Sequence, residues 1–224
     1  DRKLWRDLWH MRGQAVAIVL VIASGVATYV MFLVTLDSLQ LSRAVFYQDY
    51  RFGQVFTSLK RAPESVRARM ADLPGVAQVE TRVVADVNLD IAGFTEPVMS
   101  KFVSIANGGD AAHALNRLYL REGRLPEPGR QDEVVVSEAF AEAHGLLPGN
   151  TFHAVLNGRR QALTLVGTAL SPEYIHQLRP SGMFPDYQRY SVMWMNRSAL
   201  AQAFGLDGAF NDVVLTLTAG GSAQ

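Results

Sequence analysis

The sequence contains no cysteine, and only three of its 21 basic residues are lysines. The missing cysteines exclude disulfides, thiol nucleophiles and cysteine-ligated metal sites. The basic residues are balanced by 21 acidic ones, so the formal net charge is zero. A nucleic-acid-binding domain normally shows a basic excess, and we therefore expect no nucleic-acid partner. We interpret the preference for arginine over lysine as the codon bias of a GC-rich bacterial genome.

Catalytic motifs are also missing. The five histidines are dispersed without H-x-x-x-H or H-E-x-x-H spacing, and no G-x-S-x-G segment occurs. His144 lies near a predicted helix end, where a histidine usually caps. Four acidic residues flank a loop rich in proline and glycine, and we expect them to be solvated: Glu122, Glu127, Asp132 and Glu133. These patterns predict a chain that is not an enzyme and holds no metal or cofactor.

One long apolar run is present. Residues 15–36 carry no charged side chain, and about 20 apolar residues suffice to cross a bilayer as a helix. Basic residues are concentrated before the run, which places the N-terminus in the cytoplasm by the positive-inside rule: Arg2, Lys3, Arg6 and Arg12. A signal peptide is the alternative. Its apolar part usually has 7 to 15 residues and a cleavage site of small residues, and no such site follows this run.

The residues around this run predict a membrane-associated N-terminal region. Residues 1–13 are predicted to form an amphipathic helix at the membrane surface, with Trp5, Arg6, Trp9 and Arg12 at the interface. Residues 14–36 would span the membrane, 37–52 would form a stalk, and 53–224 would form an extracytoplasmic domain. Small residues within the span predict helix packing: Ala23, Ser24, Gly25, Ala27 and Thr28. Such residues are also common in any membrane helix, so packing stays one of two interpretations.

The remaining residues mix strands and helices, which predicts an α+β domain. Residues 63–74 read as a helix with Pro63 in its first turn, and the second half of 111–131 reads as a loop. Val134–Val136 should be a strand, followed by Ser137 as N-cap and a helix over 138–144 that ends at Gly145. Asn157-Gly158 between two apolar runs predicts a hairpin. Asn196 or Ser198 should cap a helix after the strand at 190–195.

The stretch 171–195 gathers aromatic residues, methionines and prolines without helix or strand periodicity. One interpretation is a packed irregular loop. The other is a contact surface for a partner or substrate, formed by Tyr174, Phe184, Tyr187 and Trp194.

The segment Arg121–Phe152 resembles the extracytoplasmic domain of MacB/FtsX-type ABC transporter permeases. The matching residues are Gly123-Arg124-Leu125-Pro126, Asp132-Glu133, Val134 to Ser137, Gly145-Leu146 and Gly149 to Phe152. The order of basic arm, membrane helix, stalk and exported domain agrees with the same family.

The resemblance implies a non-catalytic permease component in the bacterial inner membrane, with its main domain outside the cytoplasm. A cytoplasmic ABC ATPase subunit would hydrolyse ATP and move the exported domain, and membrane lipid would surround the span. The family has four or more membrane helices, so we expect this chain to be a piece of a longer protein, or to pair with a second protomer. The alternative is a single-pass sensor with an extracytoplasmic ligand-binding domain. The sequence beyond Gln224 would separate the two hypotheses.

Overall fold

The computed structural model describes residues 11–106, 113–179 and 182–218 of the chain. The chain divides into two compact units, Asp1–Asp49 and Tyr50–Gln224. The second unit is a mixed α+β domain, which confirms the predicted fold class.

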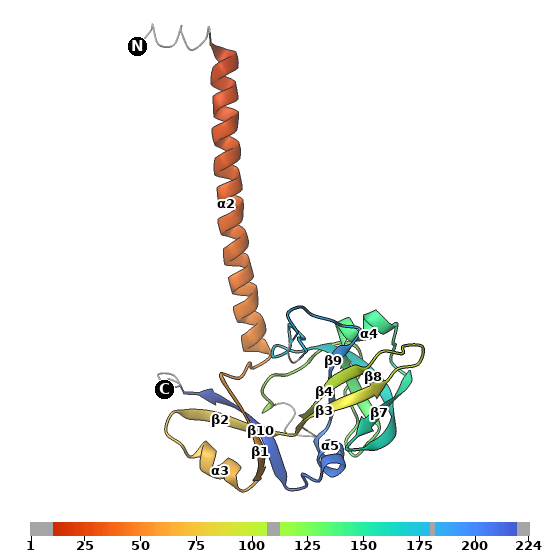
Figure 1. Cartoon of the computed structure of the whole chain (residues 1–224). Coiled ribbons are helices and arrows are strands. Elements are labelled where there is room, and N and C mark those ends of the chain that lie inside the picture. The colour runs from red at the N-terminus through yellow and green to blue at the C-terminus, as the bar shows by residue number, and fades with distance from the viewer. Residues whose placement is uncertain (1–10, 107–112, 180–181, 219–224) are drawn as a thin grey trace. The chain divides into compact units, whose positions relative to one another are not determined.

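The first unit contains one unbroken helix, α2 (Arg12–Asp49), which Figure 1 shows in orange. At about 1.5 Å per residue its 38 residues extend over about 57 Å. None of its residues is buried, and its most apolar window has a mean hydropathy of 2.5. Within the described ranges it is the one helix long and apolar enough to cross a membrane. Arg12 is its first residue, whereas Trp5, Arg6 and Trp9 lie outside the described residues.

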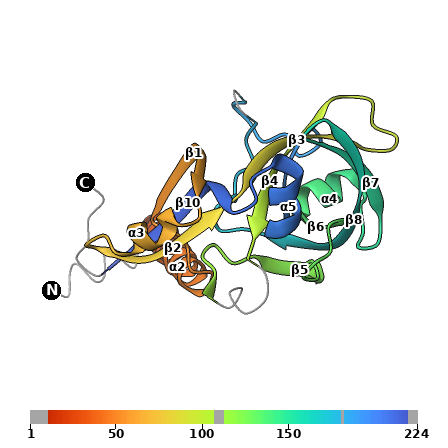
Figure 2. The same cartoon turned by 90° about the horizontal axis from the view of Figure 1, so that it is seen from below.

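Most of the second unit is a closed β-barrel. Six strands follow one another around it: β8 (Arg159–Leu170), β6 (Glu133–Ser137), β9 (Tyr190–Asn196), β4 (Val98–Ile105), β3 (Val84–Asp90) and β7 (Thr151–Leu156). Because β7 also pairs with β8, the ring closes and leaves no free edge within it. A seventh strand, β5 (Tyr119–Gly123), pairs with β8. Figure 2 shows these strands curving around α4 (Glu138–His144) and α5 (Arg197–Phe204).

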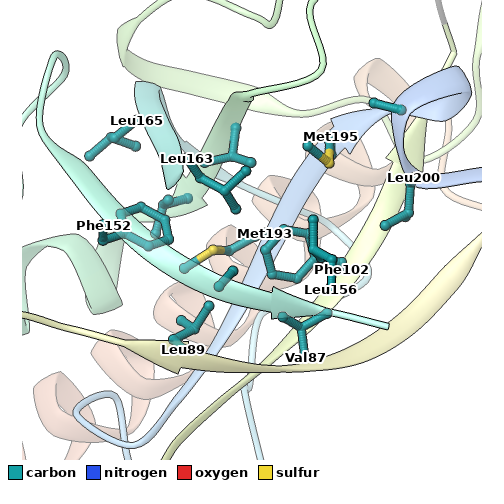
Figure 3. Close-up of a cluster of buried hydrophobic side chains, with 14 of the residues drawn as sticks. Val87, Leu89, Phe102, Phe152, Leu156, Leu163, Leu165, Met193, Met195 and Leu200 are labelled. Carbon is teal, nitrogen blue, oxygen red and sulfur yellow. The ribbon is translucent and has the colours of Figure 1, made fainter. Parts of the chain in front are cut away.

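The barrel core consists of side chains from these strands and from α4 and α5. Phe102, Phe152 and Met193 lie within it (Figure 3), together with Phe140 of α4 and Leu200 of α5. All of these side chains are less than 5% exposed. The strands and the two short helices between them therefore contribute to one common core.

Strand β9 is buried on both of its faces, which explains the apolar run from Val192 to Met195 within it. Met193 and Met195 point into the barrel core, whereas Val192 and Trp194 belong to a second cluster. Trp194 is only 3% exposed. Its predicted place on a contact surface is therefore wrong.

A smaller antiparallel sheet stands beside the barrel. Its strands are β1 (Val55–Pro63), β10 (Ala209–Leu217) and β2 (Val76–Arg82), with β10 in the centre. Helix α3 (Val66–Ala71) contributes Val66 and Met70 to the apolar cluster of this sheet. The predicted helix was too long at its start, because Pro63 ends β1 opposite Ala209 instead of opening the helix.

Two local predictions are confirmed and two are corrected. Helix α4 covers Glu138–His144 and ends at Gly145 in the left-handed conformation. Asn157 and Gly158 both have positive φ, at 47° and 78°, as a type I′ hairpin turn requires. The predicted loop, the second half of 111–131, overlaps the end of β5, and His144 does not cap its helix but bonds through Nε2 to the carbonyl of Gln188 at 2.8 Å.

Candidate functional site

The motif that resembles the permease family begins where two backbones come very close. A Cβ at Gly167 of β8 would lie 2.5 Å from the carbonyl oxygen of Arg124, so only glycine fits there. Gly123 has a φ of +73°, and a Cβ there would lie 2.2 Å from the carbonyl oxygen of Val166. The amide of Arg124 donates to this same oxygen at 2.9 Å. The two glycines allow this close approach and therefore fix the position of Arg124, where the chain turns away from β8.

Arg124 closes the following loop by binding Glu133, the first residue of β6. Its two terminal nitrogens lie 2.8 Å and 2.7 Å from the two carboxylate oxygens of Glu133. The amide of Glu127 also donates to Glu133, at 2.8 Å. The Glu133 side chain is 5% exposed, and the hydrogen bonds from Arg124 lower its pKa to about 2. The predicted solvated loop is therefore wrong for Glu133. We call this pair the Arg124 clamp.

The loop between Arg124 and Glu133 is also tied to the end of β9. The side-chain amide of Asn196 donates to the carbonyl oxygens of Glu127 and Arg130, at 2.6 Å and 2.9 Å. Asn196 occupies the N-cap position of α5 without a capping side-chain bond. Ser137 likewise occupies the N-cap position of α4, but its hydroxyl bonds to Gln177 Oε1 at 2.9 Å. Both predicted caps thus serve tertiary contacts instead.

A second arginine lies at the junction of the small sheet and the barrel. Arg82, at the end of β2, is 6% exposed and lies between two carboxylates. Its guanidinium contacts Glu173 at 2.5 Å and 2.9 Å, and Asp212 of β10 at 2.6 Å and 2.8 Å. Burial, the largest single influence, lowers the pKa of Arg82, but the hydrogen bond and charge of Glu173 together with the charge of Asp212 outweigh it and leave the pKa raised. Burial also raises the pKa of Asp212, against the influence of Arg82. We call these three residues the Arg82 clamp.

The Arg82 clamp extends to the residues where the chain enters the domain. Asn116 donates from Nδ2 to Glu173 at 2.8 Å and accepts a bond from the amide of Gly53 at 2.8 Å. The amides of Asn116 and Arg117 donate to the carbonyls of Arg51 and Tyr50, at 3.0 Å and 2.8 Å. A Cβ at Gly53 would lie 2.1 Å from a methyl carbon of Val214. Sequence reasoning missed this network, because its members are up to 130 residues apart.

The predicted aromatic surface is not one surface. Tyr174 packs against Trp194 with 6.4 Å between ring centroids, and both belong to the second apolar cluster. Burial raises the pKa of Tyr174. Tyr187 is half-buried, whereas Phe184 is 77% exposed. The positions of Tyr174 and Trp194 thus agree with a packed irregular loop. Of the four predicted residues, only Phe184 is exposed.

The small residues of α2 share one exposed stretch of the helix: Ala23, Ser24, Gly25, Ala27 and Thr28. The hydroxyls of Ser24 and Thr28 donate to the carbonyls of Val21 and Ser24 in their own helix, at 2.8 Å and 2.9 Å. Their donor hydrogens are therefore already used. A Cβ at Gly25 would meet no atom within 4 Å, so this position is open to another helix. Packing of α2 against further helices stays a prediction.

A hollow of about 530 Å³ lies between the small sheet and α5. Two of its charged residues pair with each other: Arg197 binds Glu64 at 2.6 Å, and the Thr81 hydroxyl also donates to Glu64 at 2.7 Å. Throughout the described part of the chain, no buried side-chain nitrogen or oxygen lacks a partner. The same residues contain no group of three His, Asp or Glu that could hold a metal ion. The hydrogen bonds of the two clamps join parts of the domain together.

Comparisons with known proteins concern the domain. No family model and no curated protein matches the sequence. The extracellular domain of the noncanonic ABC-type transporter YknZ from Gram-positive bacteria matches with a TM-score of 0.46 and 15% identity, over 73% of this chain and 82% of that one. The periplasmic region of MacB from Actinobacillus actinomycetemcomitans matches with a TM-score of 0.43 and 12% identity, over 72% and 67%. A domain of a permease protein from Porphyromonas gingivalis matches with a TM-score of 0.39 and 15% identity, over 76% and 72%.

Proposed function

We propose that this chain is the first membrane helix and the extracytoplasmic domain of a MacB/FtsX-type ABC transporter permease. The motif at Arg121–Phe152 carries the proposal. Its matching residues are those that build the Arg124 clamp, strand β6, helix α4 and the turn into β7. The residues of the motif are spread over 32 positions in the sequence but form one connected part of the barrel. A chance match to the family's motif explains this less well than membership does.

The proposed mechanism is transmission of motion through α2. A cytoplasmic ABC ATPase subunit drives movement of the membrane helices, and α2 passes this movement to Tyr50–Gly53. Those residues are bonded to Asn116, and Asn116 is bonded to the Arg82 clamp. A displacement of the chain at Gly53 is therefore shared by the small sheet and the barrel. The substrate would be exported across, or extracted from, the inner membrane.

The proposed orientation has the N-terminus in the cytoplasm and the domain outside. The four basic residues before the apolar run support it through the positive-inside rule. The basic arm with Trp5 and Trp9 would lie at the inner surface of the membrane. Further permease helices, from the same protein or a second protomer, would pack against α2.

The test is purification of the full-length protein from its native membranes in mild detergent. We expect an ATP-binding subunit to copurify, and mass spectrometry would identify it. A single-pass sensor is favoured if no ATP-binding protein copurifies and none is encoded in the same or neighbouring genes. This alternative stays open because residues 11–106, 113–179 and 182–218 contain a single candidate membrane span.

Gly25 offers a finer test of helix packing. Gly25→Leu places a branched side chain where no atom of this chain lies within 4 Å, so the isolated helix should tolerate it. Against a neighbouring helix the same side chain prevents close approach, so the yield of copurified partners should fall. Val26→Leu is the control, because it exchanges one branched apolar side chain for another. Equal yields from both variants would contradict a role for Gly25 in packing.

A further inference from the structure

The segment Ser171–Arg189 between β8 and β9 carries the two most exposed large apolar side chains of the described chain. Met183 is 85% exposed and Phe184 is 77% exposed, more than any apolar residue of α2. Ile175 and Leu178, in the same segment, are 50% and 44% exposed. Exposed apolar side chains gathered in one segment indicate a surface that contacts another phase or molecule.

The base of this segment is firmly attached to the barrel. Glu173 belongs to the Arg82 clamp, and Gln177 bonds to Ser137 at 2.9 Å. At the other end, Arg189 is paired with Glu96, in the connection between β3 and β4, and within the segment with Asp186 at 3.4 Å. Both ends of the segment are thus held by side-chain bonds. A loosely attached segment therefore does not explain why these side chains are exposed.

The segment leaves the barrel at the end where the chain enters the domain. Leu170, the last residue of β8, pairs with Tyr119, the first residue of β5. Asn116 and Arg117, just before Tyr119, bond to the carbonyls of Arg51 and Tyr50. Tyr50 directly follows α2 in the chain. The end of the barrel that carries the exposed apolar residues is therefore the end tethered to the helix.

The part of α2 between the apolar run and the domain is short enough to keep this end of the barrel near a membrane. From Leu36, the end of the apolar run, to Asp49, α2 continues for 13 residues, or about 20 Å. Glu173 and Met183 are ten residues apart, a stretch that reaches at most about 36 Å when extended. A membrane surface is within that reach.

The chemistry also favours lipid over a protein partner. A stable protein interface buries about 800 Å² on each side and needs a complementary shape. Two protruding side chains offer no such flat area, whereas a bilayer accepts protruding apolar side chains of any shape. Arg179, with its side chain 41% exposed, lies 3.7 Å from Asp186 of the same segment. We propose that Met183 and Phe184 insert into the outer leaflet of the membrane that α2 crosses, an inference that rests on the proposed membrane span.

The absence of cysteine makes a direct test simple. Single-cysteine variants Phe184→Cys, Arg159→Cys and Val26→Cys of the full chain would be spin-labelled and placed in nanodiscs of phosphatidylethanolamine and phosphatidylglycerol. Arg159 is an exposed residue at the opposite end of β8, and Val26 lies within the apolar run. Collisions with oxygen report lipid, and collisions with a water-soluble nickel chelate report water.

We expect the oxygen-to-nickel collision ratio at position 184 to be several-fold higher than at 159 and to approach that at 26. A ratio at 184 equal to that at 159 would overturn the proposal while the span stands. A label at 184 shielded from both reagents would also overturn it, because protein would then cover this surface. A water-like ratio at 26 would overturn the span and the insertion together, which separates the two failures.

Discussion

Arg82 and Arg124 form clamps of the same chemistry in different surroundings. Each guanidinium bonds to both oxygens of one glutamate, a strong and geometrically specific pairing. The Arg82 side chain is 6% exposed and joins two strands of the small sheet to the segment after β8, whereas Arg124 is 46% exposed and bonds to Glu133, nine positions later in the chain. Water can replace a lost partner at Arg124 but not at Arg82. The buried clamp should therefore govern the stability of the domain, and the exposed clamp should govern the position of one loop.

Replacing Arg82 should have the largest effect. Arg82→Met leaves the buried Glu173 and Asp212 carboxylates without their counter-charge, and removing one partner of a buried pair costs about 3–5 kcal/mol. We expect a loss of this size in the free energy of unfolding, measured by urea denaturation. Arg121→Met is the matched control, because its bond to Glu138 at 2.7 Å is at the surface. Similar losses in both variants would contradict the difference drawn between buried and exposed pairs.

A substitution at Gly167 should have an intermediate effect. Gly167→Ala puts a Cβ within 2.8 Å of the carbonyl oxygens of Arg124 and Glu122, so β5 must move away from β8. Overpacking of this kind costs about 1–3 kcal/mol. Hydrogen exchange should become faster at the amide of Arg124, which bonds to Val166.

The control for this substitution is Gly182→Ala, whose Cβ would come no closer than 3.3 Å to another atom. We expect that variant to leave exchange at Arg124 unchanged. If the amide of Arg124 exchanges equally slowly in Gly167→Ala and in the unchanged protein, then β5 tolerates the added methyl group. The close approach would then have no part in positioning Arg124.

The smallest effect is expected from Glu133 and depends on pH. Its pKa is about 2 in the folded domain against an ordinary 4.5, so between these values the unfolded chain binds more protons. The stabilisation is therefore fully present above pH 4.5 and is lost as the pH falls towards 2. Glu133→Gln should lower the melting temperature at pH 7 and flatten its decline between pH 5 and 3.

Glu127→Gln is the control for this titration, because Glu127 is 62% exposed and lies 3.5 Å from Arg124. Its melting temperature should follow the unchanged protein at every pH. If Glu133→Gln declines with acid as steeply as the unchanged protein, another carboxylate is responsible for the acid sensitivity.

The two clamps also show what the sequence could predict. Local patterns were sufficient for α4, because Ser137 and Gly145 mark its two ends within nine residues. The Asn157-Gly158 hairpin was equally local. Strand β5 was missed because its five residues are mostly exposed and its pairing with β8 depends on Gly167, more than 40 residues away.

The functional residues divide in the same way. Arg124 and Glu133 were part of a recognisable motif, although burial of the carboxylate was not foreseen from its polar neighbours. The Arg82 clamp had no local signal, since Arg82, Glu173 and Asp212 meet only when the small sheet and the barrel come together. Trp194 was assigned to a surface because burial of both faces of β9 cannot be read from one apolar strand.

The central claim is that ATP hydrolysis in the cytoplasm moves the domain outside. Its most direct test is a fluorophore on Arg159→Cys in the full protein, reconstituted in vesicles with the copurified ATP-binding subunit. With ATP added only on the side of the N-terminus, we predict a fluorescence change that requires hydrolysis and disappears in a subunit that cannot hydrolyse ATP. Unchanged fluorescence while ATP is being hydrolysed would contradict the account.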